Sequence, residues 1–189
     1  MTYSPASIEL LDHVCPVILG RSFVIIDVET TGFGANASVT EAAGILVTVE
    51  LHDGIAQFVP AAAMSVHLCA MSALNTLLSP MESPTLKLTQ FLQTAVAQGA
   101  IYVAHNAGFD HRMLQQVIQL PPATWLCTLN DLEWCGKGRR LEQIYQQVYG
   151  SVQMPHKALD DATILLNLLN QLAVKPVINW LGMFDAVVE

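Results

Sequence analysis

The segment Phe23–Gly32 constrains this chain more than any other, because an apolar strand pattern there ends in two neighbouring carboxylates. It reads Phe-Val-Ile-Ile-Asp-Val-Glu-Thr-Thr-Gly, and its aromatic and β-branched start predicts a buried strand over 22–28. Side chains alternate along a strand, so Asp27 and Glu29 share one face with their Cα atoms roughly 7 Å apart. Two such acids repel each other unless a cation lies between them. Oxygen ligands of this kind suit Mg²⁺ or Mn²⁺.

Two further motifs carry acids and histidines beside apolar elements. His105–Asp110 reads His-Asn-Ala-Gly-Phe-Asp after an apolar strand pattern, and His156–Ala162 reads His-Lys-Ala-Leu-Asp-Asp-Ala at the start of a helix pattern. Asp110 falls in the first turn of a predicted helix, where the helix dipole alone favours an acid by roughly 0.3–1 kcal/mol. His156 follows Pro155, so we expect it on a loop. An imidazole with an ordinary pKa of about 6.5 suits proton transfer near neutral pH.

Taken in order, Asp-x-Glu-Thr-Thr-Gly, His-Asn-x-x-Phe-Asp and His-x-Ala-x-x-Asp resemble the DEDDh family of 3′–5′ exonucleases. The family includes the proofreading subunit of bacterial DNA polymerase III and exodeoxyribonuclease X, and the resemblance runs from about 23 to about 172. It implies a ribonuclease H-like exonuclease fold and hydrolysis that releases nucleoside 5′-monophosphates from 3′ ends. The segments Tyr102–Ala107 and Trp125–Leu129 look closest to exodeoxyribonuclease X and the proofreading branch. DNA is therefore favoured as the substrate.

The resemblance also implies roles for individual residues. Four acids would hold two Mg²⁺ or Mn²⁺ ions in each active site, and a histidine would act as the general base. These catalytic residues are Asp27, Glu29, Asp110, Asp161 and His156. The motif spacing selects Asp161 rather than Asp160. The residues implied to bind substrate are Thr30, Phe33, His67, His105, Asn106 and Phe109. The chain departs from the family after His67, where Leu68 stands in place of the usual glycine.

Other readings of the same residues stay open. An exoribonuclease acting on short RNA, similar to oligoribonuclease or RNase T, would share the chemistry and differ in how it treats the 2′-hydroxyl. A catalytically silent exonuclease-like module that binds a polymerase or another protein is the third hypothesis, although all the catalytic residues are present. Structural roles also exist for single residues. The Asp27–Glu29 pair could cap a turn, Phe109 could be a core aromatic, and His156 could be a capping residue.

The charge balance shapes the expected partner. The chain of 189 residues has a net charge of −8 and only 8 Lys and Arg residues, so few cations are available to grip a long phosphate backbone. This favours a short, metal-anchored contact with a single-stranded 3′ end, with a polymerase or another protein as a possible partner. Polar residues interrupt the uncharged stretch between Asp53 and Glu82, so we expect no membrane partner. The start of the chain lacks a secretory pattern and the cysteines lack paired spacing, which predicts a cytoplasmic location.

The predicted architecture is one α/β domain with a mixed five-stranded central sheet flanked by helices. We divide the chain into an N-terminal helical segment (1–21), an exonuclease domain (22–175) and an apolar C-terminal tail (176–189) packed on the domain or on a partner. The strands are expected at 22–28, 40–49, 55–59, 100–104 and 125–127. The helices are expected at 4–14, 70–78, 84–98, 106–118, 141–149 and 159–172.

Overall fold

A computed structural model describes the parts of the chain that surround the predicted site. The described residues are 19–34, 36–53, 55–68, 83–131, 134, 140–150 and 156–173. The predicted helices at 4–14 and 70–78 and the apolar tail at 176–189 lie outside them. No helix in the described part of the chain is both long enough and apolar enough to cross a membrane.

The centre of the fold is a mixed five-stranded sheet, as the sequence predicted. Its strands are β1 (Ser22–Thr30), β2 (Val39–His52), β3 (Ile55–His67), β4 (Ile101–Ala104) and β5 (Trp125–Cys127). Their order across the sheet is β3-β2-β1-β4-β5. The strands β1, β2 and β3 pair antiparallel, whereas β4 is parallel to β1 and β5 is parallel to β4. The carboxyl ends of β1, β4 and β5 therefore lie side by side at one end of the sheet.

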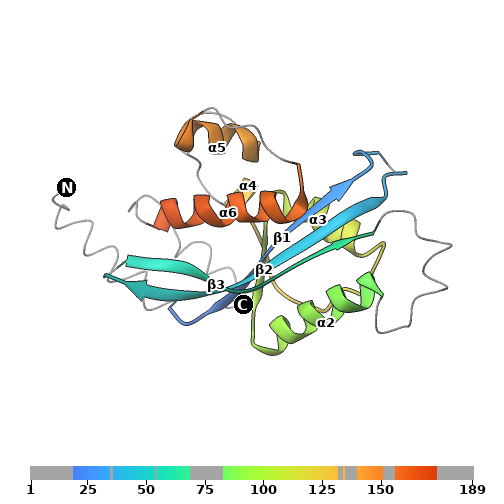
Figure 1. Cartoon of the computed structure of the whole chain (residues 1–189), viewed down its shortest axis with the longest axis horizontal. Coiled ribbons are helices and arrows are strands. Elements are labelled where there is room, and N and C mark those ends of the chain that lie inside the picture. Colours follow the sequence, from blue (N-terminus) through green and yellow to red (C-terminus); the bar gives the residue numbers. More distant parts are fainter. Residues whose placement is uncertain are drawn as a thin grey trace.

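Helices cover both faces of the sheet. They are α2 (Pro84–Ala97), α3 (Ala107–Leu114), α4 (Thr128–Asp131), α5 (Leu141–Tyr149) and α6 (Ala158–Ala173). In Figure 1, α6 lies along one face of the sheet, α2 lies on the opposite face, and α5 lies beyond α6. The architecture is α/β with an open mixed sheet between helices, and it is compatible with a ribonuclease H-like arrangement.

The alternation of β1 divides the core into two halves and sets the direction of the acids. Phe23 and Ile25 pack in the cluster that contains residues of α6, whereas Val24 and Ile26 pack in the cluster that contains residues of α2. Continuing the alternation places Asp27 and Glu29 on the same face as Ile25. These acids therefore project toward the side of the sheet that α6 covers.

Two predicted boundaries were wrong. The strand expected to end at Val59 continues to His67 as β3. Pro60 is tolerated because β3 is an edge strand and the pairing shifts there, from Val47 opposite Pro60 to Leu46 opposite Ala62. The helix expected to reach 118 ends at Leu114. The chain then continues in turns closed by hydrogen bonds between residues three apart, such as Val117 N–H to the carbonyl of Leu114.

Candidate active site

The first pair of acids lies at the carboxyl end of β1. Asp27 faces into the site, where burial and the charges of Asp110, Asp161, Glu29 and Glu41 raise its pKa well above the usual range. Burial also raises the pKa of Glu29, and the nearby His156 opposes that shift. A carboxylate surrounded by other carboxylates gives up its proton reluctantly unless positive charge is supplied.

Asp110 joins the site from the first turn of α3. Its side chain is only 3% exposed. The carboxylate accepts hydrogen bonds from its own backbone N–H and from that of Val28, which lies between Asp27 and Glu29. Burial nevertheless raises the pKa of Asp110 to about 7. Asn106 precedes α3 with a left-handed backbone (φ 76°), and its side chain makes no capping hydrogen bond.

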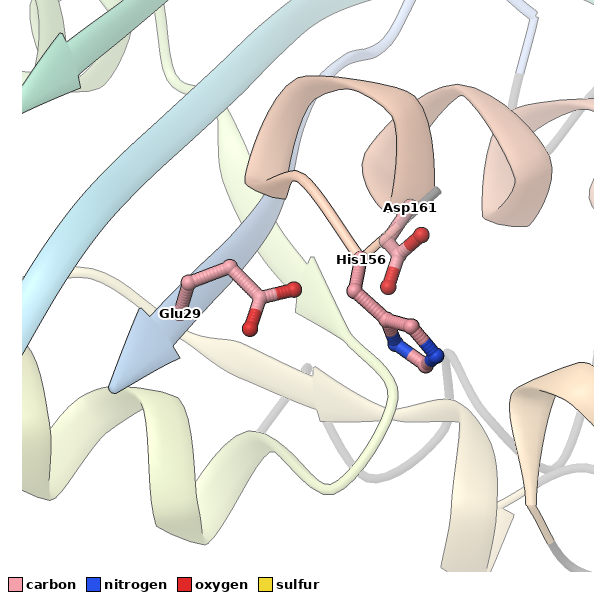
Figure 2. Close-up of side chains that lie close together, drawn as sticks. All are labelled: Glu29, His156 and Asp161. Atoms are coloured by element: carbon pink, nitrogen blue, oxygen red, sulfur yellow. The ribbon is translucent and has the colours of Figure 1, made fainter. Parts of the chain in front are cut away.

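Glu29 on β1 converges with His156 and Asp161, which lie just before α6 and in its first turn. One ligand atom from each lies within 4.8 Å of the other two. Figure 2 shows the Glu29 carboxylate, at the end of β1, facing the side chains of His156 and Asp161 at the start of α6. His156 is on the predicted loop, is exposed, and has a left-handed backbone (φ 50°). That conformation is several-fold enriched in Asn, Asp and His.

Asp161, rather than its neighbour Asp160, belongs to this group. It is 8% exposed, and its Oδ1 atom is buried without a hydrogen-bond partner in the described part of the chain. Burial and the charge of Glu29 raise its pKa to about 6, while His156 lowers it. A buried carboxylate oxygen without a donor is costly, and a cation would remove that cost. We call Asp27, Glu29, Asp110 and Asp161 the acid cluster.

A pocket of about 330 Å³ opens beside the acid cluster. Asp27, Asp110 and Asp161 line it together with four of the predicted substrate-binding residues. These four are Phe33, His105, Asn106 and Phe109. The structure thus brings together side chains from three motifs that are widely separated in the sequence.

The wall of the pocket carries an aromatic pair, the exposed Phe33 and the half-buried Phe109. The rings of Phe33 and Phe109 have centroids 5.9 Å apart, and the Arg112 guanidinium lies 5.6 Å from the centroid of Phe109. Phe33 is 90% exposed, which is exceptional for a side chain of that size. Deeper in the site, His105 Nδ1 lies 3.0 Å from the hydroxyl of Thr128, which fixes one edge of the imidazole.

Two predicted substrate-binding residues lie outside the pocket lining. The Thr30 hydroxyl donates to the Gly32 carbonyl at 2.7 Å, so it serves the turn after β1. His67 is exposed at the end of β3, where it pairs across the sheet with Glu41. Their roles in substrate binding stay predictions.

Two residues without a predicted role do belong to the site. Arg140 lines the pocket, and Glu41 approaches the start of α6. A basic run that ends at Arg140 is visible in the sequence, and it indicates Arg140 as a candidate for phosphate binding. Nothing local in the sequence indicates the contact of Glu41.

The donors of the acid cluster fit hard divalent cations. Carboxylate oxygens suit Mg²⁺ or Mn²⁺ better than soft metals, which prefer thiolates. The free thiol among the described residues, Cys127, lies on β5. No protein-family model matches this chain, and no match to it was found among curated proteins.

Proposed function

We propose that this protein is a metal-dependent 3′–5′ exonuclease of the DEDDh type that acts on single-stranded DNA ends. The observation that carries the proposal is the convergence of Glu29, His156 and Asp161, with the orphaned Oδ1 atom of Asp161 among them. Asp27 and Asp110 complete the acid cluster beside the same pocket. Bound Mg²⁺ or Mn²⁺ would supply charge stabilisation to the phosphate under attack. The ribonuclease H-like exonuclease fold is part of the proposal.

The acid cluster would hold the ions, and His156 would handle the proton. The exposed imidazole lies at the rim of the cluster, so it can take a proton from an attacking water and release it to solvent. Its position on the loop before α6 keeps it beside Asp161. The proposed general base and a proposed metal ligand therefore lie close together in the sequence, on the loop before α6 and in its first turn.

The pocket would hold the last nucleotide of the strand. A volume of about 330 Å³ lies at the low end of the range for small-ligand sites, which favours a strand end over a duplex. Phe33 and Phe109 offer ring surfaces for base stacking, which tolerates any base. Arg140 also lines the pocket. Its positive charge would let it contact a phosphate. One such cation suits a short contact in a chain of net charge −8.

The test is digestion of matched 5′-labelled DNA and RNA oligomers with Mg²⁺ or Mn²⁺. The proposal predicts a ladder that shortens from the 3′ end, with nucleoside 5′-monophosphates as products, and faster loss of DNA than of RNA. A circularised DNA oligomer must stay intact. Faster loss of RNA would shift the assignment to an exoribonuclease of the same chemistry.

Variants connect the activity to the acid cluster. Asp27→Asn and Asp161→Asn should abolish digestion, whereas Asp53→Asn should not. Asp53 is a matched control because it is exposed in the turn between β2 and β3 and has a left-handed backbone (φ 52°), which asparagine tolerates. Digestion that survives in Asp27→Asn would contradict the proposed site. A wild-type protein that neither digests nor binds Mn²⁺ would favour the silent interaction module.

A further inference from the structure

Glu41 is a buried acid whose two oxygens reach different elements. It lies on β2 and is 8% exposed. Its Oε1 atom accepts a hydrogen bond of 2.6 Å from the Ser65 hydroxyl on β3. Its Oε2 atom accepts the backbone N–H of Ala158 at 3.4 Å, across 117 residues of sequence. Glu41 therefore connects the edge of the sheet to the first residue of α6.

An additional acid at this site is unfavourable, because it is buried and the neighbouring carboxylates repel it. Glu41 pairs across the sheet with Glu29, and its charge contributes to the raised pKa values of Asp27 and Glu29. Unlike Glu29, it is not among the converging ligand atoms. Both of its oxygens are engaged by protein donors instead. A buried carboxylate held in this way serves the arrangement of the protein around it.

The contact at Ala158 lies at the first residue of α6. The first backbone N–H groups of a helix have no partner within the helix, and a carboxylate near them is also favoured by the helix dipole. Ala158 is the first residue of α6, Asp161 lies in the same turn, and His156 lies two residues earlier. Any shift of this turn would move both side chains relative to Glu29.

We propose that Glu41 is a positioning residue that holds the first turn of α6, and with it Asp161 and His156, against the end of β1. This inference rests on the proposed exonuclease function for its effect on activity. Its structural part, the contact between Glu41 and Ala158, is testable without any activity.

The first measurement is hydrogen exchange at the Ala158 amide by NMR. In Glu41→Ala this amide loses its acceptor, and we expect exchange at least tenfold faster than in the wild type. Glutamine can accept from Ala158 through its carbonyl oxygen while its amide donates to Ser65, so Glu41→Gln should keep most of the protection. Glu50→Ala is the matched control because Glu50 is an exposed glutamate on the same strand. Unchanged exchange in Glu41→Ala would overturn the inference.

The second measurement is steady-state digestion of the DNA oligomer. Removing a residue that supports proposed metal ligands should lower kcat by about 10–100-fold and leave KM within about threefold. Glu41→Gln should recover most of that loss, and Glu50→Ala should match the wild type. Equal loss in Glu41→Gln and Glu41→Ala would show that charge matters rather than the contact, which would also overturn the inference.

Ala158→Pro removes the same hydrogen bond from the other side. Proline lacks the N–H group and is well tolerated at the first position of a helix. If the contact is what matters, Ala158→Pro should lower kcat like Glu41→Ala, and the double variant should be no worse than either single one. Additive losses would contradict the inference. A wild-type protein without digestion would refute the exonuclease proposal alone, because the exchange result still decides the contact.

Discussion

The Asp110 carboxylate accepts a hydrogen bond from the backbone N–H of Val28. Val28 separates Asp27 from Glu29, so this bond attaches the first turn of α3 to the strand that carries the first acid pair. At the same end of β1, Glu29 faces His156 and Asp161 at the start of α6. Acids from three distant segments are thus concentrated at one point, although their mutual repulsion opposes folding.

The first prediction is that the metal-free protein loses stability as pH rises from 5 to 8. The pKa values of Asp110 and Asp161 are raised from 3.8 to about 7 and about 6, so the folded state holds protons that the unfolded state has released. Their stabilising contribution is complete below the ordinary carboxyl pKa and is lost as pH rises through the folded values. Thermal melts in EDTA across this range measure the effect.

Asp110→Asn is the variant for that experiment. Removing this carboxyl group should raise stability by on the order of 4 kcal/mol at pH 8 and by a smaller amount, on the order of 1–2 kcal/mol, at pH 5, because the unfolded state already releases its proton there. Adding Mn²⁺ at pH 8 should raise the melting temperature of the wild type more than that of the variant. A flat pH profile for the metal-free wild type would contradict the crowding of acids.

The second prediction concerns His156. His156→Asn removes the proposed base while keeping a residue that accepts the left-handed backbone at this position. We expect kcat to fall by about 10²–10⁴-fold with KM nearly unchanged, because the imidazole acts on the proton rather than on strand binding. His52→Ala is the control, since His52 is exposed and pairs with Glu50 at 3.3 Å on the surface. A kcat within threefold of the wild type would remove His156 from the mechanism.

The third prediction concerns the aromatic pair at the pocket. Phe33 is 90% exposed, so Phe33→Ala should leave the melting temperature almost unchanged. Loss of one stacked base contact, worth about 1–3 kcal/mol, should raise KM about tenfold or more. Leu51→Ala, at another exposed apolar residue, is the matched control. Equal KM values for the two variants would show that no base stacks on Phe33.

The fourth prediction tests the packing of β2 on α2. A Cβ atom at Gly44 would lie 2.9 Å from the Phe91 ring and 3.2 Å from Val24 Cγ1. Gly44→Ala should therefore destabilise the protein by about 1–3 kcal/mol, as overpacking of a core does. Gly108 on α3 has open space for a Cβ atom, so Gly108→Ala should stabilise by about 0.5–1 kcal/mol. Denaturant titrations of the two variants should show opposite signs.

The parts of the fold that depend on local patterns were predictable from the sequence. The alternation in β1, the short β5 and the helix α5 were placed within a few residues of their observed bounds, because periodicity and turn residues are written locally. The extension of β3 beyond Pro60 was not predictable, because it depends on the place of that strand at the sheet edge and on a bulge against β2.

The candidate site divides in the same way. The acids and His156 were identified from short motifs. In the structure Asp27, Asp110 and Asp161 line one pocket, and Glu29 and His156 converge on Asp161 beside it. The contact between Glu41 and Ala158 spans 117 residues, so only the packed fold reveals it. The basic run in the sequence marks Arg140 as a candidate cation, but its place in the pocket, at the start of α5, depends on the packed fold.

The most direct test of the account is anomalous diffraction from crystals soaked in Mn²⁺. We predict anomalous peaks within coordination distance of the carboxylate oxygens of Asp27, Glu29, Asp110 and Asp161, and their loss in Asp27→Asn crystals soaked in the same way. An empty acid cluster at millimolar Mn²⁺, with its carboxylates protonated or turned apart, would contradict the claim that these acids gather to hold a catalytic cation.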